Sequence, residues 1–345
     1  MKVAIIGGGF CGVLIAKKLE KIKDIQTVLI DNKSYFEYQP SLHKVVFKPE
    51  YINKIRRDYT SFLKNTEIII RSVKKVTSQQ IITSKEKINF DILIISTGID
   101  YPIFLENEEN VHVLKNGAES LQISKKIRYA KHILIVGGGL IGTEFAGEIV
   151  TKLPNKSVTI IHPHNKILER IPHDAAYYTQ KFFEKNRVKF IFGEKVISHI
   201  NGTYFTNNKR EIYADLCIWC AGIKCNPYFM KEFPDKCFSE INALKVNNYL
   251  QLDGFSNIFI GGDINNIKEE KTARKAELHA KIIVKNIKRM LTSQPLLPYK
   301  SGRSPMIISL GDWRGIILYK YVFPGLFIPG ILKWLIQWWF MRQLK

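Results

Sequence analysis

Two glycine-rich turns carry the clearest chemical signal in this sequence of 345 residues. Both have the spacing Gly-x-Gly-x-x-Gly, and they consist of Gly7, Gly9 and Gly12 in the first copy and of Gly137, Gly139 and Gly142 in the second. The first glycine of such a turn permits a tight bend, the second lets the backbone approach a pyrophosphate, and the third lets a helix pack closely on a strand. The helix N-terminus that follows offers free N–H groups and partial positive charge to phosphates. Because each copy stands between a short apolar run and a stretch of helical spacing, we expect two dinucleotide-binding sites.

The residue at the end of the following strand differs between the two turns. Asp31 ends the strand after the first turn, where a carboxylate can accept hydrogen bonds from an adenosine ribose. His162 stands at the equivalent place after the second turn, so no carboxylate there would repel a 2′-phosphate. The sequence therefore leaves NADH and NADPH both open. His164 and Lys166 either favour the phosphorylated cofactor or are ordinary exposed loop residues.

Three later strand ends resemble motifs of flavoproteins that bind two dinucleotides. The first ends in Thr97-Gly98, the second in Ala221-Gly222, and the third in Asp263. An aspartate at the third place can bind the ribityl hydroxyls of a flavin, although a turn or N-cap residue would look the same. A helix beginning near Lys271-Thr272-Ala273 would point its positive end at the flavin and stabilise its reduced anion.

Short apolar runs alternate with stretches of helical spacing, which is typical of βαβ units on a parallel sheet. We expect an α/β fold with two Rossmann-like dinucleotide-binding domains, the NAD(P) domain inserted in the FAD domain. The expected boundaries are 1–102 and 241–292 for the FAD domain, 103–240 for the NAD(P) domain and 293–345 for a C-terminal element. Further expected elements are a helix over residues 41–64, a long helix over 272–291, a hairpin formed by 306–310 and 315–319, and a C-terminal amphipathic helix.

The five cysteines indicate no disulfide framework and no metal site. Cys217 and Cys220 form a C-x-x-C pair, but they lie in an apolar run that reads as a strand. Residues three apart on a strand point to opposite faces, so we expect two buried thiols that do not meet. Cys11 lies in the first glycine turn, where we expect it to pack.

The cysteines and the N-terminus indicate a cytosol-facing protein, and the charge is compatible with an anionic partner. The net charge is +21, which suits nucleic acid, anionic lipid or a phosphate-bearing cofactor, and equally a lysine-rich solvated surface. No signal peptide precedes the first strand, and Lys2 stands where N-myristoylation requires glycine.

The last segment has an unusual composition. Residues 313–345 contain five basic residues and no acidic one, among many aromatic and aliphatic residues. Pro324-Gly325, Pro329-Gly330 and Lys333 interrupt this stretch, whereas a membrane-spanning helix needs about 20 apolar residues in succession. We expect a peripheral anchor that lies in one leaflet of an anionic membrane. The alternative is a helix buried against the body or against a partner in a homodimer.

These motifs together resemble the glutathione-reductase-like flavoproteins, and two branches of that group in particular. The segment from Phe36 to Leu42 resembles the flavin-side loop of type II NADH:quinone reductases. A longer match, nearly end to end, is to the quinone-reducing branch of the apoptosis-inducing-factor family. It is carried by 3–12, 137–149, 221–224, 243–263, 278–280, 286–287, 294–295 and 299–300.

The resemblance implies roles for particular residues. Those implied to contact FAD are Gly7, Gly8, Gly9, Phe10, Cys11 and Asp263. Lys44 falls where the family has an arginine near FAD, and Val73 falls where the backbone meets the adenine. Glu144 falls at the position that lies on the nicotinamide side in the family. The alternative is an ordinary glutamate in the first turn of a helix, where negative charge is favourable without any ligand.

The resemblance also implies the reaction. NAD(P)H would give a hydride to FAD, and the reduced flavin would reduce a lipid-soluble quinone to the quinol at a membrane surface. Two alternatives stay open at this point. One is a reductase with another acceptor, such as a ferredoxin, a disulfide or sulfide, and the other is a flavoprotein that binds nucleic acid through its positive surface.

Overall fold

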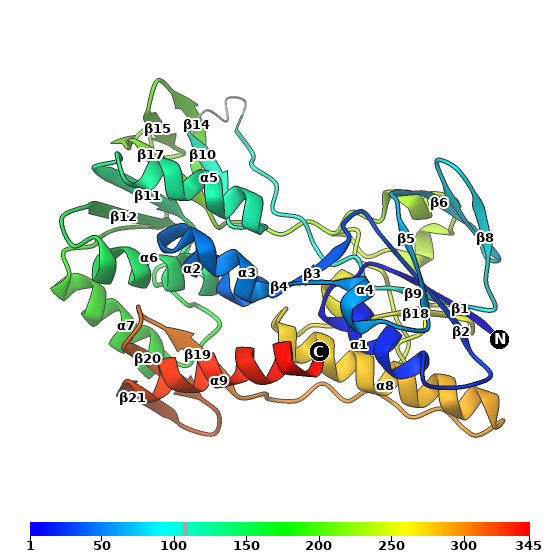
Figure 1. The fold of residues 1–345 in the computed structure, drawn as a ribbon. Coiled ribbons are helices and arrows are strands. Elements are labelled where there is room, and N and C mark those ends of the chain that lie inside the picture. The colour runs from blue at the N-terminus through cyan, green and yellow to red at the C-terminus, as the bar shows by residue number, and fades with distance from the viewer. Residues whose placement is uncertain (106–109) are drawn as a thin grey trace.

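The computed structural model describes residues 1–105 and 110–345. Its first sheet is parallel and has the strand order β18-β9-β1-β2-β5. The strands are β1 (Lys2–Ile6), β2 (Gln26–Asp31), β5 (Thr66–Ile70), β9 (Ile92–Ile95) and β18 (Ile258–Ile260). The central strands are runs of Val, Ile and Leu buried on both faces, as parallel strands covered by helices require. Helices α1 (Phe10–Leu19) and α8 (Ala273–Leu291) pack together beside this sheet (Figure 1).

The second sheet is also parallel, and its order is β10-β17-β11-β12-β13. Its strands are β10 (Val111–Val113), β11 (His132–Val136), β12 (Ser157–His162), β13 (Lys189–Phe192) and β17 (Leu216–Trp219), and its helices are α5 (Gly117–Ile127), α6 (Leu140–Lys152) and α7 (His173–Lys185). The chain leaves the first sheet after β9, completes the second sheet, and returns to the first at β18. The predicted α/β fold with two Rossmann-like cores is therefore confirmed, while the exact domain boundaries stay a prediction.

Smaller antiparallel sheets flank the two cores. They are formed by β6 (Val73–Val76), β7 (Gln80–Thr83) and β8 (Lys87–Asn89), by β14 (Val196–Ile200), β15 (Thr203–Thr206) and β16 (Glu211–Tyr213), and by the pair β3 (Tyr35–Glu37) and β4 (Arg56–Asp58).

The long helix predicted over 41–64 is wrong. The segment instead forms α2 (Leu42–Phe47), α3 (Ile52–Ile55), strand β4 and α4 (Tyr59–Phe62). Pro49 cannot donate a helical hydrogen bond, and Lys48 before it takes an extended φ of −137°. Arg56 is extended as well and pairs with Glu37. Because the segment is divided in this way, the short helix α2 packs against helices α5 and α6, which belong to the second Rossmann-like core.

The C-terminal segment forms a three-stranded antiparallel sheet followed by a helix. Strands β19 (Met306–Ser309) and β20 (Arg314–Leu318) are the predicted hairpin, and β21 (Val322–Leu326) is an additional edge strand. Pro324 fits in β21 because an edge strand leaves one side without ladder bonds. Helix α9 (Ile328–Gln343) starts with Pro329 in its first turn, where a proline is tolerated, so this residue begins the helix and does not interrupt it.

Helix α9 is buried along one face and exposed along the other. Its Phe340 ring lies 4.8 Å from the ring of Phe10 and 5.4 Å from that of Phe36, between centroids. Met341 and Leu344 are buried as well. The helix runs from the C-terminal sheet toward α1, which contains Phe10 (Figure 1). Among residues 1–105 and 110–345, no helix combines the length and apolar content that crossing a membrane requires.

Candidate functional site

A cavity of about 1930 Å³ is lined by residues of both Rossmann-like units and of the C-terminal segment. It contains most of the predicted flavin-side residues together with the first turn of α6. The predicted residues that line it are Gly7, Gly8, Gly9, Phe10, Cys11, Asp31, Thr97, Gly98, Glu144, Asp263, Thr272 and Ala273. Sites predicted from separate parts of the sequence therefore share one space.

The first glycine turn has the geometry that a phosphate site needs. Gly7 has a φ of +98°, and a Cβ there would lie 2.5 Å from the carbonyl oxygen of Ser96. A Cβ on Gly12 would lie 1.9 Å from the carbonyl oxygen of Gly7. Gly9, the N-cap of α1, meets nothing within 4 Å, and no side chain caps the helix. The first-turn N–H groups of α1 are thus presented to open space, as binding of a diphosphate requires.

The second turn repeats this geometry. Gly137 has a φ of +111°, and a Cβ on Gly142 would lie 2.0 Å from the carbonyl oxygen of Gly137. Gly139, the N-cap of α6, again meets nothing within 4 Å. In both copies the first and third glycines are required by packing, and the middle one leaves room for a ligand.

The strand-end residues contact the turns in matching ways. Asp31 accepts a hydrogen bond from the amide of Gly8 at 2.5 Å. His162 accepts one from the amide of Gly138 at 3.1 Å, through Nδ1. His162 does not line the cavity, whereas Glu169, which lies 2.9 Å from its Nε2, does.

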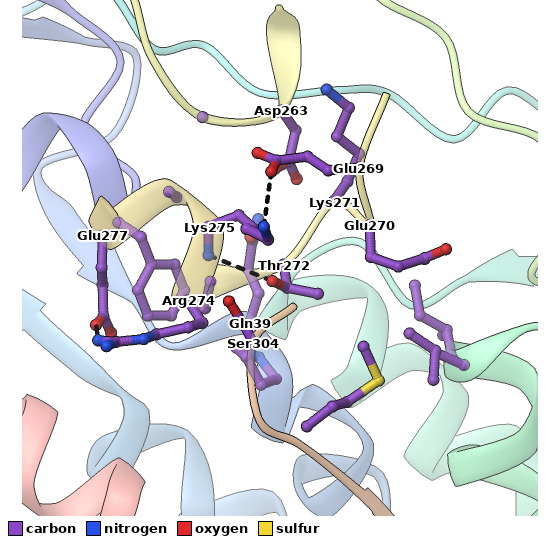
Figure 2. A pocket seen from close by; sticks show the side chains of 18 of the residues that line it. Gln39, Asp263, Glu269, Glu270, Lys271, Thr272, Arg274, Lys275, Glu277 and Ser304 are labelled. Carbon is purple, nitrogen blue, oxygen red and sulfur yellow. Dashed lines mark hydrogen bonds and ion pairs between the residues drawn. The ribbon is translucent and has the colours of Figure 1, made fainter. Parts of the chain in front are cut away.

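The start of α8 forms another wall of the cavity. Figure 2 shows Asp263, Glu269 and Lys271 gathered near this helix N-terminus. Thr272 is the N-cap and accepts a hydrogen bond from the amide of Lys275 at 3.3 Å. Burial raises the pKa of Asp263, and the Lys271 ammonium opposes that change. The N-terminus of α8 thus lies at the cavity, near the carboxylate of Asp263, while the binding of a flavin there stays a prediction.

Glu269 organises the residues behind that wall. Its carboxylate lies 2.7 Å from the Lys275 ammonium and 2.9 Å from Nε2 of His279. Burial alone would raise the pKa of Glu269, but hydrogen bonds from His279, Lys275, Ser301 and Tyr299 hold it well below its usual range. Sequence reasoning did not identify this cluster, because its members come from two segments, 269–279 and 299–301, that only folding brings together.

Glu144 lies in the first turn of α6 and lines the cavity. Its Oε1 lies 2.5 Å from the ammonium of Lys333 in α9 and accepts the backbone amide of Ser309 at 3.0 Å. Lys333 also lines the cavity. Sequence reasoning treated Lys333 only as an interruption of an apolar stretch and missed this contact.

Several predicted residues do not line the cavity. They are Gly12, Lys44, Val73, Gly137, Gly139, Gly142, His162 and Gly222. The Lys44 ammonium lies over the Tyr51 ring, 5.6 Å from its centroid, and burial lowers its pKa. The carbonyl of Val73 accepts the hydroxyl of Tyr228 at 3.0 Å. The cofactor roles assigned to these residues stay predictions.

The cysteines are all free thiols. Burial raises the pKa of Cys217, and it raises that of Cys220 to about 12. Cys11 is buried in the first turn of α1, where burial and the nearby Asp263 charge raise its pKa far above the ordinary value. As predicted, Cys217 and Cys220 form no disulfide, and Cys11 packs close to Gly261. None of these three thiols is poised to act as a nucleophile.

One group in the described part of the chain has the composition of a metal site. It consists of His162, His164 and Glu169, whose ligand atoms lie within 4.8 Å of one another. The amide of Gly138 can only donate, so Nδ1 of His162 has no proton and Nε2 carries it. A protonated Nε2 cannot bind a metal ion, so this arrangement favours the hydrogen bond to Glu169 over coordination.

Comparisons with known proteins agree with this geometry. A family model described as pyridine nucleotide-disulphide oxidoreductase matches residues 1–280. Ferroptosis suppressor protein 1 of Taeniopygia guttata is 30% identical, over 96% of this chain and 92% of its own length. Apoptosis-inducing factor homolog A of Dictyostelium discoideum is 31% identical, over 96% of this chain and 88% of its own length. The solved structure of NDH2 from Plasmodium falciparum in complex with NADH has a TM-score of 0.88 at 17% identity, and covers 100% of this chain and 94% of that one.

Proposed function

Since this chain belongs to the pyridine nucleotide-disulphide oxidoreductase family, and is an FAD-dependent enzyme that oxidises NAD(P)H, we propose that it passes the electrons to a lipid-soluble quinone. Bound FAD would supply the hydride acceptor and the carrier of two electrons. The chain's own residues then have three tasks, which are to hold two dinucleotides, to orient the nicotinamide and to admit the quinone.

The single observation that favours a quinone as the electron acceptor is the position of α9. Four residues of this helix line the cavity, namely Leu332, Lys333, Ile336 and Trp339. Other residues of the same helix face outward, with Ile328 61% exposed and Trp334 51% exposed. An apolar molecule that arrives at the outer face of α9 therefore needs to pass only one helix to reach the cavity. A long-chain quinone has that chemistry, and a polar acceptor does not.

Each glycine turn is proposed to bind a different dinucleotide, and Glu144 is proposed to lie near the nicotinamide. We assign FAD to the turn at 7–12, with Asp31 at the ribose and Asp263 beside the start of α8. We assign NAD(P)H to the turn at 137–142, with Glu144 at the nicotinamide end. Because Glu144 and the flavin-side residues line the same cavity, the two redox rings can meet in it.

The outer surface of the C-terminal segment suits a membrane interface. Its exposed apolar and aromatic residues that do not line the cavity are Trp313, Phe323, Leu326, Phe327, Ile328, Ile331, Trp334, Leu335 and Trp338. Lys320, Arg342 and Lys345 are exposed on the same segment. Aromatic rings with basic residues favour the headgroup region of an anionic bilayer. We propose that the protein binds peripherally through this surface and that the quinone enters there.

The alternatives have less support. A disulfide or sulfide acceptor needs reactive sulfur beside the flavin. Among the described residues the one cysteine that lines the cavity is Cys11, which is buried with a raised pKa. The net charge of +21 suits nucleic acid as well as lipid. Binding of nucleic acid would not explain, however, why residues of α9 line the cavity.

The test is stopped-flow spectroscopy of the FAD-loaded protein without membranes. NADH or NADPH should bleach the flavin, and a short-chain ubiquinone should then restore its colour much faster than oxygen does. Ferricyanide serves as an acceptor that needs no apolar pocket. Ile336→Glu, on the cavity side of α9, should slow recovery by the quinone but not by ferricyanide. Ile331→Glu, on the outer face alone, is the matched control and should slow neither. Bleaching without recovery by the quinone would reject the proposed acceptor.

A further inference from the structure

The two glycine turns use different side chains for the same hydrogen bond. In the first unit the carboxylate of Asp31 accepts the amide of Gly8, and it also lines the cavity. In the second unit the imidazole of His162 accepts the amide of Gly138. His162 therefore occupies the place of the ribose-binding carboxylate without supplying its charge.

The protonation of His162 follows from its partners. A backbone amide only donates, so Nδ1 is the acceptor and Nε2 carries the proton. Nε2 then donates to Oε2 of Glu169 at 2.9 Å. Burial lowers the pKa of His162, which keeps the ring neutral at pH 7. Partial burial of Glu169 acts to raise its pKa, but its own backbone amide and His162 together lower it, so Glu169 is a carboxylate.

Glu169 is the member of this pair that a ligand can touch. It lines the cavity together with Leu140 and Ile141 from the first turn of α6, immediately after the glycine turn. We propose that Glu169, held in place by His162, accepts the adenosine ribose hydroxyls of the nicotinamide dinucleotide and thereby selects NADH over NADPH. The inference rests on the NAD(P)H-oxidising part of the proposed function and is independent of the electron acceptor.

Nearby cations do not cancel this selection. The guanidinium of Arg170 lies 3.8 Å from Oε1 of Glu169, but its side chain is 71% exposed. Water and salt screen exposed charges strongly. A 2′-phosphate in this place would face the Glu169 carboxylate directly, while a ribose hydroxyl would donate to it.

The test is calorimetric binding to the FAD-loaded protein with no quinone present. The probes are ADP-ribose and its 2′-phosphorylated analogue. We expect the unmodified protein to prefer ADP-ribose by about tenfold or more, because like charges in contact are costly. Glu169→Gln keeps an acceptor for His162 but loses the charge, so its preference should fall by about tenfold.

Two further variants make the result specific. Asp174→Asn removes another carboxylate that lines the cavity but is exposed and has no contact with His162, and it should leave the preference unchanged. His162→Glu combined with Glu169→Gln moves the charge to the strand end and should restore the preference for ADP-ribose. The flavin absorbance of each variant reports that it folds. Equal preferences in Glu169→Gln and the unmodified protein, or an unmodified protein that prefers the 2′-phosphate, would overturn the proposal. Failure of quinone reduction would leave these binding results unaffected.

Discussion

The ammonium of Lys333 lies 2.5 Å from the carboxylate of Glu144, although 189 residues separate them in the chain. The ion pair joins α9, whose outer face is apolar, to the first turn of α6, which follows the second glycine turn. Ser309 completes the contact by donating its amide to Glu144 at 3.0 Å. The end of the protein that we propose to contact the membrane is therefore linked directly to the place that we propose for the nicotinamide.

Glu144→Gln should slow hydride transfer while leaving the fold intact. The amide keeps an acceptor for Ser309, but the negative charge is removed from the place that we propose for the nicotinamide. We expect flavin bleaching by NADH to slow by about 10- to 100-fold, which corresponds to the loss of one charged contact. Stopped-flow absorbance measures the rate, and the bound FAD content checks the fold. A bleaching rate equal to that of the exposed control variant Glu184→Gln would contradict a role for Glu144.

Lys333→Met should affect docking of the C-terminal helix. The partly buried ion pair is lost and Glu144 is left without its cation, which costs about 1–3 kcal/mol. Limited proteolysis should therefore cleave near α9 sooner than in the unmodified protein. Lys320→Met removes an exposed lysine of the same segment that forms no ion pair with Glu144, and it should not change the proteolysis. Unaltered proteolysis of Lys333→Met would show that the ion pair does not hold the helix.

The second and third glycines of the turn that we assign to NAD(P)H should respond differently to alanine. A Cβ on Gly139 enters open space, so Gly139→Ala should fold normally, lose about tenfold in NADH affinity and keep its FAD. A Cβ on Gly142 would lie 2.0 Å from the carbonyl oxygen of Gly137, so Gly142→Ala should lower the melting temperature. Calorimetry and thermal unfolding distinguish the two effects. Equal melting temperatures would contradict the assignment of Gly142 to packing.

The sequence predicted the features that depend on local spacing. The glycine turns, their strands and helices, and the start of the long helix near Thr272 are each encoded within a few neighbouring residues. The contacts Lys333–Glu144 and Tyr299–Glu269 could not be predicted, because they depend on how distant segments pack. The broken helix over 41–64 had a local signal in Pro49, but the pairing of Arg56 with Glu37 is a tertiary contact.

Acid should destabilise the protein partly through Glu269. Its pKa is depressed in the folded state, so the stability it contributes is present above its unfolded value of about 4.5 and is lost as the pH falls below it. Glu269→Gln should lower stability at pH 7 by about 3 kcal/mol, since it leaves Lys275 and His279 buried without their carboxylate. As the pH is lowered from 7, the melting temperature of the variant should also fall less steeply than that of the unmodified protein. Parallel pH profiles for the variant and the unmodified protein would contradict this assignment.

Membrane binding should depend on the exposed face of α9 and should not affect flavin reduction. Trp334 and Trp338 are 51% and 46% exposed, and their rings stack at 6.5 Å between centroids. Replacing both with glutamate removes two interfacial anchors and adds charges that anionic lipid repels, so we expect vesicle affinity to fall by about 100-fold or more. Sedimentation with vesicles that contain phosphatidylserine measures binding, and flavin bleaching by NADH in solution should be unchanged. Tyr129→Glu, an aromatic residue 85% exposed outside the C-terminal segment, is the matched control. Vesicle binding that survives the double replacement would show that the basic surface elsewhere, and not α9, holds the protein on lipid.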